Sequence, residues 1–302
     1  MVKSMFAAIA GLRAHQSKMD VIGNNIANVN TYGFKTARTT FQESIYQTLS
    51  ASTAGNAVFG GTNPSQIGYG STVASIDLNF STSSYVPTGV ATDCMIDGEG
   101  FFVVGQKLAG TVSTSNKELT GSSTEALDQL SLSRVGNFKT DGDGYLVDAN
   151  GYLVYGFTVA SDGTVSSELS PIRIPVDPSD PTQRMNLGSI SIDSNGNVTG
   201  VSDTNTVVSI GRIAVAYVSN PNGLEKVQGP YYRIAGNVGT VEAFSPSEGS
   251  TGSLMTSGLE MSNVDLANEF SDMITTQRGF QANSRIITVT DEMLEELVNL
   301  KR

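Results

Sequence analysis

The residues best suited to chemistry are two glycines, an acidic turn, one histidine and one cysteine. Gly100 and Gly105, followed by Gln106 and Lys107, are spaced almost as in a phosphate-binding loop. The lysine is one position late, no Ser or Thr follows it, and no helical pattern follows to present its N-terminal N–H groups to a phosphate. These glycines are therefore interpreted as turns on either side of a short strand.

The candidates for a metal site are equally incomplete. Asp141-Gly-Asp143-Gly begins like a calcium loop, but the third acidic position and the distal Glu are absent. His15 is the only His of the chain, and there is no second His or Cys pair to complete a zinc site. We predict a hairpin turn at residues 141–144, a surface position for His15, and neither metal nor cofactor.

Nucleophilic catalysis has no support in the sequence. There is no Gly-x-Ser-x-Gly elbow, and any Ser–His pair would depend on the single His15. Cys94 is the only cysteine, which excludes an internal disulfide framework. Two interpretations stay open for Cys94: a small buried hydrophobic residue, or a thiol that forms a covalent cross-link between subunits. No catalytic residue is predicted, and an enzyme is the least supported class.

A long amphipathic helix is predicted at the C-terminal end, from Ser262 to Arg302. Ser262 and Asp265 have the spacing of a capping box, and Gly279 is the only Gly or Pro in this range. Apolar residues recur in alternating steps of four and three, which places them on one side of a helix. This predicted seam contains Leu266, Phe270, Met273, Phe280, Ile287, Leu294 and Val298.

A second apolar seam with the same spacing lies in the first 30 residues. Its members are Met5, Ile9, Leu12, Met19 and Ile26. Residues 1–40 carry five bases and one acid, whereas residues 260–302 carry four bases and eight acids. Opposite charge beside two apolar seams favours pairing of the two helices with each other over self-pairing. We therefore predict that the terminal helices pair as in a coiled coil.

The middle of the chain is predicted to be antiparallel β structure. Short β-type segments are separated by Asp-Gly and Asn-Gly pairs, which supply the positive φ angles of hairpin turns. The turns are predicted at residues 141–144, 150–151, 162–163, 195–196 and 222–223. The strands are predicted at residues 72–80, 101–105, 134–139, 145–148, 152–159, 172–176, 188–193, 206–218 and 231–235. This density of turns is typical of a sandwich or barrel.

The predicted fold class is α+β. Paired long N- and C-terminal helices, coiled-coil-like, carry an inserted all-β, mainly antiparallel sandwich or barrel domain. The predicted divisions are a helical domain at 1–30 and 262–302, a connecting arm with some β structure at 31–92 and 236–261, and an outer β domain at 93–235.

Charge and hydropathy restrict the partners. The net charge of −11 argues against nucleic acid, because binding phosphates needs a basic face. No apolar run is long enough to span a bilayer, and the first residues form an amphipathic pattern instead of a signal peptide. We predict no nucleic-acid partner, no membrane insertion, and export only by a route that leaves the N-terminus uncleaved.

Three separated motifs resemble the bacterial flagellar rod and hook protein family. Residues 20–35, DVIGNNIANVNTYGFK, are similar to the N-terminal signature of that family, and residues 262–266 and 297–302 to its C-terminal motifs. Residues 98–102 are similar to its motif at the entry to the first outer domain. The signature residues are Asn24, Asn25, Ala27, Asn28, Gly33, Phe34 and Lys35.

The resemblance implies a helical tube of many copies, with the terminal helices around a central export channel and the β domains outside. The seam residues would then be polymerisation contacts. The implied partners are further copies, other axial proteins (distal rod, hook cap, hook–filament junction) and the flagellar type III export apparatus. The implied location is the extracellular flagellum or its basal body.

Within the family the sequence looks most like the hook protein, a flexible coupling that transmits motor torque to the filament. Its ending, Leu-Val-Asn-Leu-Lys-Arg, favours the hook. The β region is short, however, and keeps the compact distal rod protein as an alternative. From another class, the alternative is a β-sandwich surface adhesin, a monomer whose terminal helices would be dispensable.

Overall fold

The computed structural model describes residues 2–55, 60–107, 112–113, 119, 129–159, 165–176, 184–202 and 206–300. The chain divides into two compact units. Unit 1 contains Met1–Val29, Thr36–Asn79 and Val264–Arg302, and unit 2 contains Asn30–Lys35 and Phe80–Asn263. The chain therefore crosses between the units four times, so neither unit is a continuous stretch of sequence.

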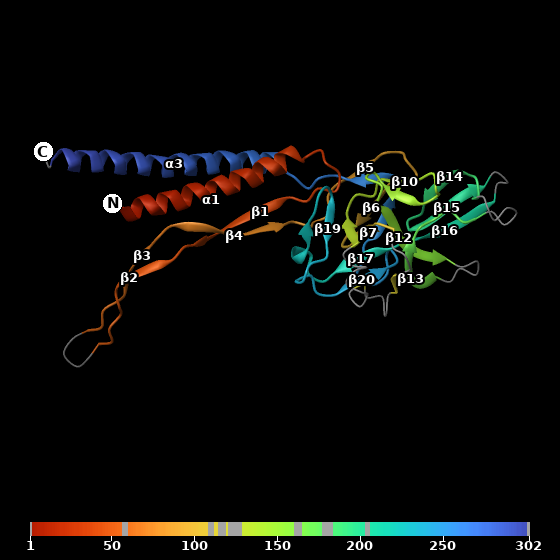
Figure 1. The fold of residues 1–302 in the computed structure, drawn as a ribbon, viewed down its shortest axis with the longest axis horizontal. Coiled ribbons are helices and arrows are strands. Elements are labelled where there is room, and N and C mark those ends of the chain that lie inside the picture. Colours follow the sequence, from red (N-terminus) through yellow and green to blue (C-terminus); the bar gives the residue numbers. More distant parts are fainter. Residues whose placement is uncertain are drawn as a thin grey trace. The chain divides into compact units, whose positions relative to one another are not determined.

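Two long helices dominate unit 1. They are α1, Val2–Ala27, and α3, Leu266–Asn299 (Figure 1). The N-cap of α3 is Asp265 rather than the predicted Ser262, and its side chain accepts from the N–H groups of Ala267 and Asn268. Neither helix is long and apolar enough to cross a membrane, as judged over the described residues.

The predicted coiled-coil pairing of these helices is wrong. They run antiparallel, since Gly11 lies against Asn283, and Asn25, later in α1, lies against Glu269, early in α3. Small and polar residues make several of the close contacts. A Cβ placed on Gly11 would lie 2.6 Å from Nδ2 of Asn283, and one on Gly279 would lie 2.7 Å from the His15 ring. The absence of a side chain at each glycine lets the helices approach there without interlocking apolar seams.

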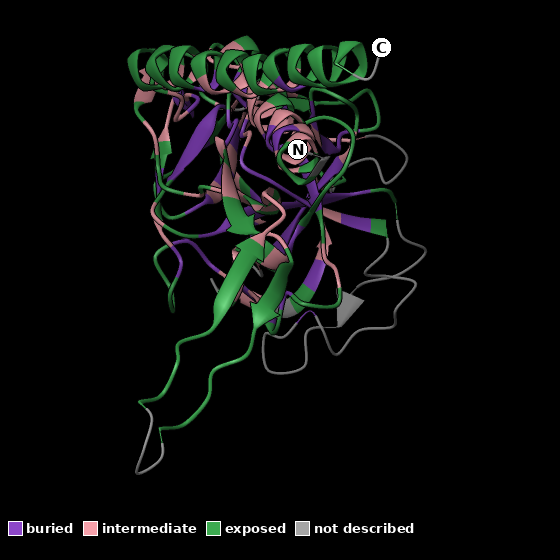
Figure 2. Cartoon of the chain, turned by 90° about the vertical axis from the view of Figure 1, so that its left-hand side faces the viewer, coloured by how far each residue is buried: buried purple, intermediate pink, exposed green. Residues whose placement is uncertain are grey.

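Exposure along α3 agrees with this correction. Leu266, Phe270, Leu294 and Val298 of the predicted seam are exposed, Val298 by 67%. The buried residues of α3 are Thr276 and Thr290, both outside that seam. Figure 2 shows α3 coloured as exposed along most of its length. The spacing of apolar residues thus predicts the helix, and Met273, Phe280 and Ile287 of the seam are half-buried, but both ends of the seam are exposed.

Unit 1 also contains two antiparallel strand pairs. Strand β1, Ala37–Glu43, pairs with β4, Ser71–Leu78, which corresponds to the strand predicted at 72–80. Strand β2, Tyr46–Ser50, pairs with β3, Ser65–Gly68, and their residues are almost all exposed.

Unit 2 is built around a fourteen-stranded sheet. Its main path runs β14-β15-β16-β12-β7-β9-β19-β18, with the other strands branching from it, and every pairing among described residues is antiparallel. Two small pairs, β6–β21 and β5–β22, stand apart from this sheet. The bounds are β5 Tyr85–Pro87, β6 Cys94–Asp97, β7 Phe101–Gly105, β8 Val112–Ser113, β9 Leu130–Ser133, β10 Phe138–Thr140, β11 Leu146–Asp148, β12 Leu153–Val159, β13 Val165–Pro171, β14 Leu187–Ile192, β15 Asn197–Ser202, β16 Val207–Ile213, β17 Val215–Val218, β18 Glu225–Lys226, β19 Tyr231–Arg233, β20 Val241–Phe244, β21 Ser253–Thr256 and β22 Gly258–Glu260.

Most predicted strands of unit 2 are present. The strand at 101–105 is β7, and those at 145–148, 152–159, 188–193 and 231–235 correspond to β11, β12, β14 and β19. Residues 172–176 make only isolated pairings, and the turn at 222–223 is part of the 3-10 helix Pro221–Gly223, so these two predictions are wrong. The strand predicted at 134–139 is present only at its end, in β10, and the one predicted at 206–218 is two strands, β16 and β17. The turn predicted at 162–163 lies outside the described residues. The predicted division into a connecting arm and an outer β domain stays a prediction.

Candidate functional site

The segment Asn30–Lys35, between α1 and β1, is an integral part of unit 2. Gly33 has a φ of 65°, and a Cβ at this position would lie 2.8 Å from a methyl carbon of Val135. Its N–H donates to the carbonyl of Glu260 at 2.9 Å. Glycine fits here because it has no side chain and adopts positive φ freely. The signature glycine therefore holds the segment against β22.

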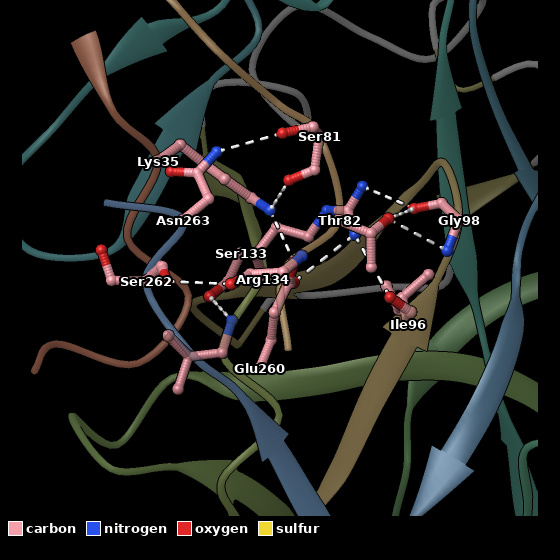
Figure 3. Close-up of polar contacts among 12 residues, drawn as sticks. Lys35, Ser81, Thr82, Ile96, Gly98, Ser133, Arg134, Glu260, Ser262 and Asn263 are labelled. Carbon is pink, nitrogen blue, oxygen red and sulfur yellow. Dashed lines mark hydrogen bonds and ion pairs between the residues drawn. The ribbon is translucent and has the colours of Figure 1, made fainter. Parts of the chain in front are cut away.

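Lys35 ends this segment with its side chain fully buried. Its Nζ lies 2.6 Å from Oε1 of Glu260 and donates to the carbonyl of Ser81 at 2.8 Å (Figure 3). Asn263 donates its backbone N–H to the carbonyl of Phe34 at 3.4 Å. Residues from three distant parts of the sequence thus meet at one ammonium group.

Arg134 brings a second buried cation to the same carboxylate. Its Nη1 lies 3.5 Å from Oε2 of Glu260, and its Nη2 donates to the carbonyl of Gly98 at 2.9 Å. The guanidinium also lies over the Phe101 ring, 5.2 Å from its centroid. We call Lys35, Arg134 and Glu260 the charge cluster; its three side chains are at most 2% exposed.

The charge cluster is unbalanced, with two cations and one anion. Burial lowers the pKa of Lys35, and the neighbouring Glu260 partly offsets that effect. Burial likewise lowers the pKa of Arg134. Arg134 Nε and Glu260 Oε2 make no hydrogen bond to any described residue, although the 3.5 Å ion pair remains. Such a cluster tolerates the loss of its anion poorly, because two uncompensated charges would remain buried.

Asn25, another signature residue, is the polar centre of unit 1. It is 1% exposed, and its side chain bonds both the carbonyl and the N–H of Ala37, at 2.9 and 3.1 Å. Its Nδ2 also lies 3.0 Å from Oε1 of Glu269. Burial raises the pKa of Glu269, and the Asn25 hydrogen bond partly opposes this rise. One carboxamide therefore connects α1, β1 and α3.

The other signature residues differ in their surroundings. Asn28 donates its side-chain amide to Asn24, while Ala27 is exposed at the end of α1. Phe34 is buried, and Nζ of Lys226 lies 4.4 Å from the centroid of its ring. The signature therefore divides between the two units, with Asn25 in unit 1 and Gly33, Phe34 and Lys35 in unit 2.

The predicted polymerisation residues are placed in unit 1, but nothing in a single chain tests their role in polymerisation. Half-buried members of the predicted seams are Met5, Ile9, Leu12, Met19, Ile26, Met273, Phe280 and Ile287. The exposed members are Leu266, Phe270, Leu294 and Val298. Their function as contacts between copies stays a prediction.

The sequence candidates for chemistry occupy structural positions. Residues 101–105 form the fully buried strand β7, and residues 141–144 form the hairpin turn between β10 and β11. His15 is half-buried beside the Phe41 ring rather than on the surface, with the ring centroids 5.9 Å apart. No group of three metal-binding side chains occurs among the described residues.

Cys94 lies on β6 and is fully buried. Burial raises the pKa of its thiol, so the reactive thiolate is disfavoured. A cross-link through Cys94 stays a prediction, and it would require β6 to open.

Sequence reasoning missed Arg134 and Glu260. Each is a lone charge beside apolar residues in a β-type segment, which is the available signal that a charge is buried and paired. The pairing itself is not readable, because Lys35 and Glu260 lie 225 positions apart.

Comparison with known proteins defines the class of this architecture. The model described as "Flagella basal body rod protein" matches residues 5–35, and "Flagellar basal body rod FlgEFG protein C-terminal" matches residues 255–300. A third, "Flagellar hook protein FlgE/F/G D1 domain", matches residues 122–200. The two terminal matches include Lys35 and Glu260, the residues that meet in the charge cluster.

Relatives match over the whole chain. The flagellar basal-body rod protein FlgG of Bacillus subtilis is 42% identical over 303 residues, covering 100% of both chains. FlgG of Borreliella burgdorferi is 31% identical over 306 residues, and the flagellar hook protein FlgE of the same organism is 27% identical over 441 residues, each covering 100% of both chains.

These matches define a structural subunit of the bacterial flagellum. The chain belongs to the family of flagellar rod and hook axial proteins. Its partners therefore include further copies and other flagellar components, and its location is the flagellum. Proteins of this family are structural subunits. Membership of it is therefore favoured over the alternative of a surface adhesin.

Proposed function

We propose that the chain is the distal rod protein of the flagellar basal body, a subunit that polymerises into the hollow shaft joining motor and hook. The observation that carries this proposal is the 42% identity over full length to a basal-body rod protein. The hook, which the sequence alone favoured, is supported less well. The hook relatives of two spirochaetes are 27% identical, in alignments of 441 and 463 positions.

Length supports the same choice. The rod relatives align over 303 and 306 residues, close to the 302 residues of this chain. The hook alignments contain many positions with no counterpart here, so those hook proteins have segments that this chain lacks. A compact β unit suits a shaft whose copies pack closely.

The charge cluster supports a torque-bearing role. The chain crosses between the two units four times. Residues beside three of these crossings, namely Lys35, Ser81 and Asn263, are tied together by hydrogen bonds and ion pairs in unit 2. A buried ion pair is screened by salt much less than an exposed one, which favours a fixed connection at these crossings.

The remaining parts of the proposal follow from the family. The chain would reach its place through the flagellar type III export apparatus, without a cleaved signal peptide, and would contact hook and proximal rod neighbours in the finished axis. Its role would be structural and not catalytic. The outer β domain would face away from the channel.

Immunogold electron microscopy of isolated hook–basal bodies tests the assignment, with an antibody raised against residues 140–230. We expect gold on the straight segment that crosses the envelope. Gold along the curved segment outside the cell would instead assign the chain to the hook. A matched sample from a strain lacking the gene controls for background, and label on neither segment would refute both assignments.

A further inference from the structure

Residues 291–300, the end of α3 and its C-cap Leu300, are not covered by any other described part of the chain. Thr290 is 4% exposed and is the final buried residue, whereas every residue from 291 to 300 is exposed. The antiparallel packing explains this. Gly11 lies against Asn283, so α1 begins nearly opposite Glu292, and the end of α3 extends past it (Figure 1). We call residues 291–300 the overhang.

The overhang has two distinct faces. At about 100° per residue, its apolar side chains gather on one side of the helix and its acids on the other. The apolar residues are Met293, Leu294, Leu297, Val298 and Leu300, and the acids are Asp291, Glu292, Glu295 and Glu296. Leu300 is 82% exposed. An apolar face of this kind, bordered by acids, fits a partner with an apolar centre bordered by bases.

One surface of α1 has that chemistry. Lys3, Phe6 and Arg13 are exposed and follow one another at steps of three and seven, which places them on one side of the helix. Phe6 is 54% exposed between the two bases. Residues 1–19 contain three bases and no acid. We call these three residues the basic stripe.

The two surfaces of one chain cannot meet. The face of α1 that contacts α3 contains Gly11 and His15, whereas the basic stripe lies on the exposed side of α1. Lys3 donates to the neutral side chain of Gln47, and Arg13 makes no ion pair with a described residue. The overhang and the basic stripe are therefore both available to a second copy.

We propose that the overhang of one copy docks on the basic stripe of a second copy. The contact joins two different surfaces, so each copy offers one of each, and repetition of it gives an open helical array. Leu294 and Val298 would cover Phe6, while Asp291 and Glu295, the acids beside Val298 on the helix, would lie near Lys3 and Arg13. The proposal rests on the proposed rod function only in requiring that copies pack side by side.

Charge reversal tests this contact. The acidic variant is Lys3→Glu/Arg13→Glu, the basic variant is Asp291→Lys/Glu295→Lys, and the third variant combines all four changes. Each is expressed as the full chain in a strain lacking the gene. We expect at least a tenfold loss of the chain from purified basal bodies for each double variant, and recovery in the combined variant.

The control is Glu168→Lys/Glu248→Lys, which makes the same charge change at exposed positions of unit 2. It should assemble like the unsubstituted chain. Circular dichroism of each purified variant should show unchanged helix content, because the reversed acids make no hydrogen bond or ion pair with a described residue and Lys3 loses only its surface contacts with Gln47 and Tyr69. The amount of chain in the culture medium separates failed export from failed assembly.

Two results would overturn the contact: double variants that assemble normally, or a combined variant that assembles no better than either double variant. Both leave the rod assignment intact if the unsubstituted chain restores rods. Failure of the unsubstituted chain to enter rods would refute the assignment itself, whatever the variants do.

Discussion

Lys35 and Glu260 lie 225 positions apart in sequence, yet their charged atoms are 2.6 Å apart in a fully buried ion pair. The pair joins the N-terminal signature to the strand that precedes the C-terminal helix. Residues near both ends of the chain are therefore required to complete unit 2.

Glu260→Gln should destabilise the chain by about 3–5 kcal/mol, because it leaves Lys35 and Arg134 as buried cations without an anion. Urea unfolding followed by circular dichroism measures the change. The control is Glu225→Gln, which breaks the exposed ion pair with Arg233 and should cost less than about 1 kcal/mol. Equal losses in the free energy of unfolding would show that the buried charge cluster stabilises the chain no more than the exposed ion pair does.

Gly33→Ala should cost about 1–3 kcal/mol, because alanine is strained at a φ of 65° and its Cβ would meet Val135. Gly23→Ala is the matched control in α1, where no atom lies within 4 Å of the added carbon. That substitution should stabilise the helix by about 0.5–1 kcal/mol. Thermal unfolding of both variants measures the contrast, and a stabilising Gly33→Ala would contradict the described backbone.

Glu269 should make unit 1 more stable as the pH falls. Burial raises the pKa of Glu269 in the folded state above its unfolded value, so the folded chain binds this proton more tightly. Its contribution is fully present below the unfolded pKa and is lost as the pH rises through the folded pKa. Glu269→Gln keeps an oxygen that can accept from Asn25 and does not titrate in this range.

The measurement for Glu269 is helix unfolding between about pH 4 and 7 in both chains. The stability of the unsubstituted chain relative to Glu269→Gln should decrease with rising pH across the acidic range. A difference that stays constant with pH, or increases, would contradict the raised pKa.

Leu12→Asp or Ile287→Asp should abolish assembly while leaving unit 2 folded. Both residues are half-buried in unit 1, so a charge there disturbs the helices and not the fourteen-stranded sheet. Near-ultraviolet circular dichroism reports the tyrosines, most of which lie in unit 2, and electron microscopy reports rods. Normal rods from either variant would remove these residues from the polymerisation surface.

The sequence predicted the helices and many of the strands because their signals are local. Alternating steps of three and four place apolar residues on one side of a helix, and the Asn150–Gly151 pair predicts its hairpin turn. The middle of the predicted seam, Met273, Phe280 and Ile287, is half-buried, whereas Leu294 and Val298 lie past the start of α1 and stay exposed. The periodicity of α3 does not contain the length of its partner.

The charge cluster illustrates the corresponding limit for the site. Lys35 was singled out through the family resemblance, but Arg134 and Glu260 carry no local motif. Their ion pairs form because hydrogen bonds hold residues 30–35 beside residues 258–263 in unit 2. The comparisons support the distal rod, the alternative, better than the hook for a related reason. Both proteins share the terminal motifs, and overall length and identity distinguish them better.

Because unit 2 contains residues from both ends of the chain, it can fold completely only after nearly the whole chain has been made. A product of interrupted translation that ends before residue 260 would contain Lys35 and Arg134 but lack the anion that neutralises both. Folding of unit 2 in such a product would bury two cations without their anion. Unit 2 would therefore stay unfolded and open to proteolysis. Truncated subunits would thereby be removed before they could enter a growing shaft and end it early.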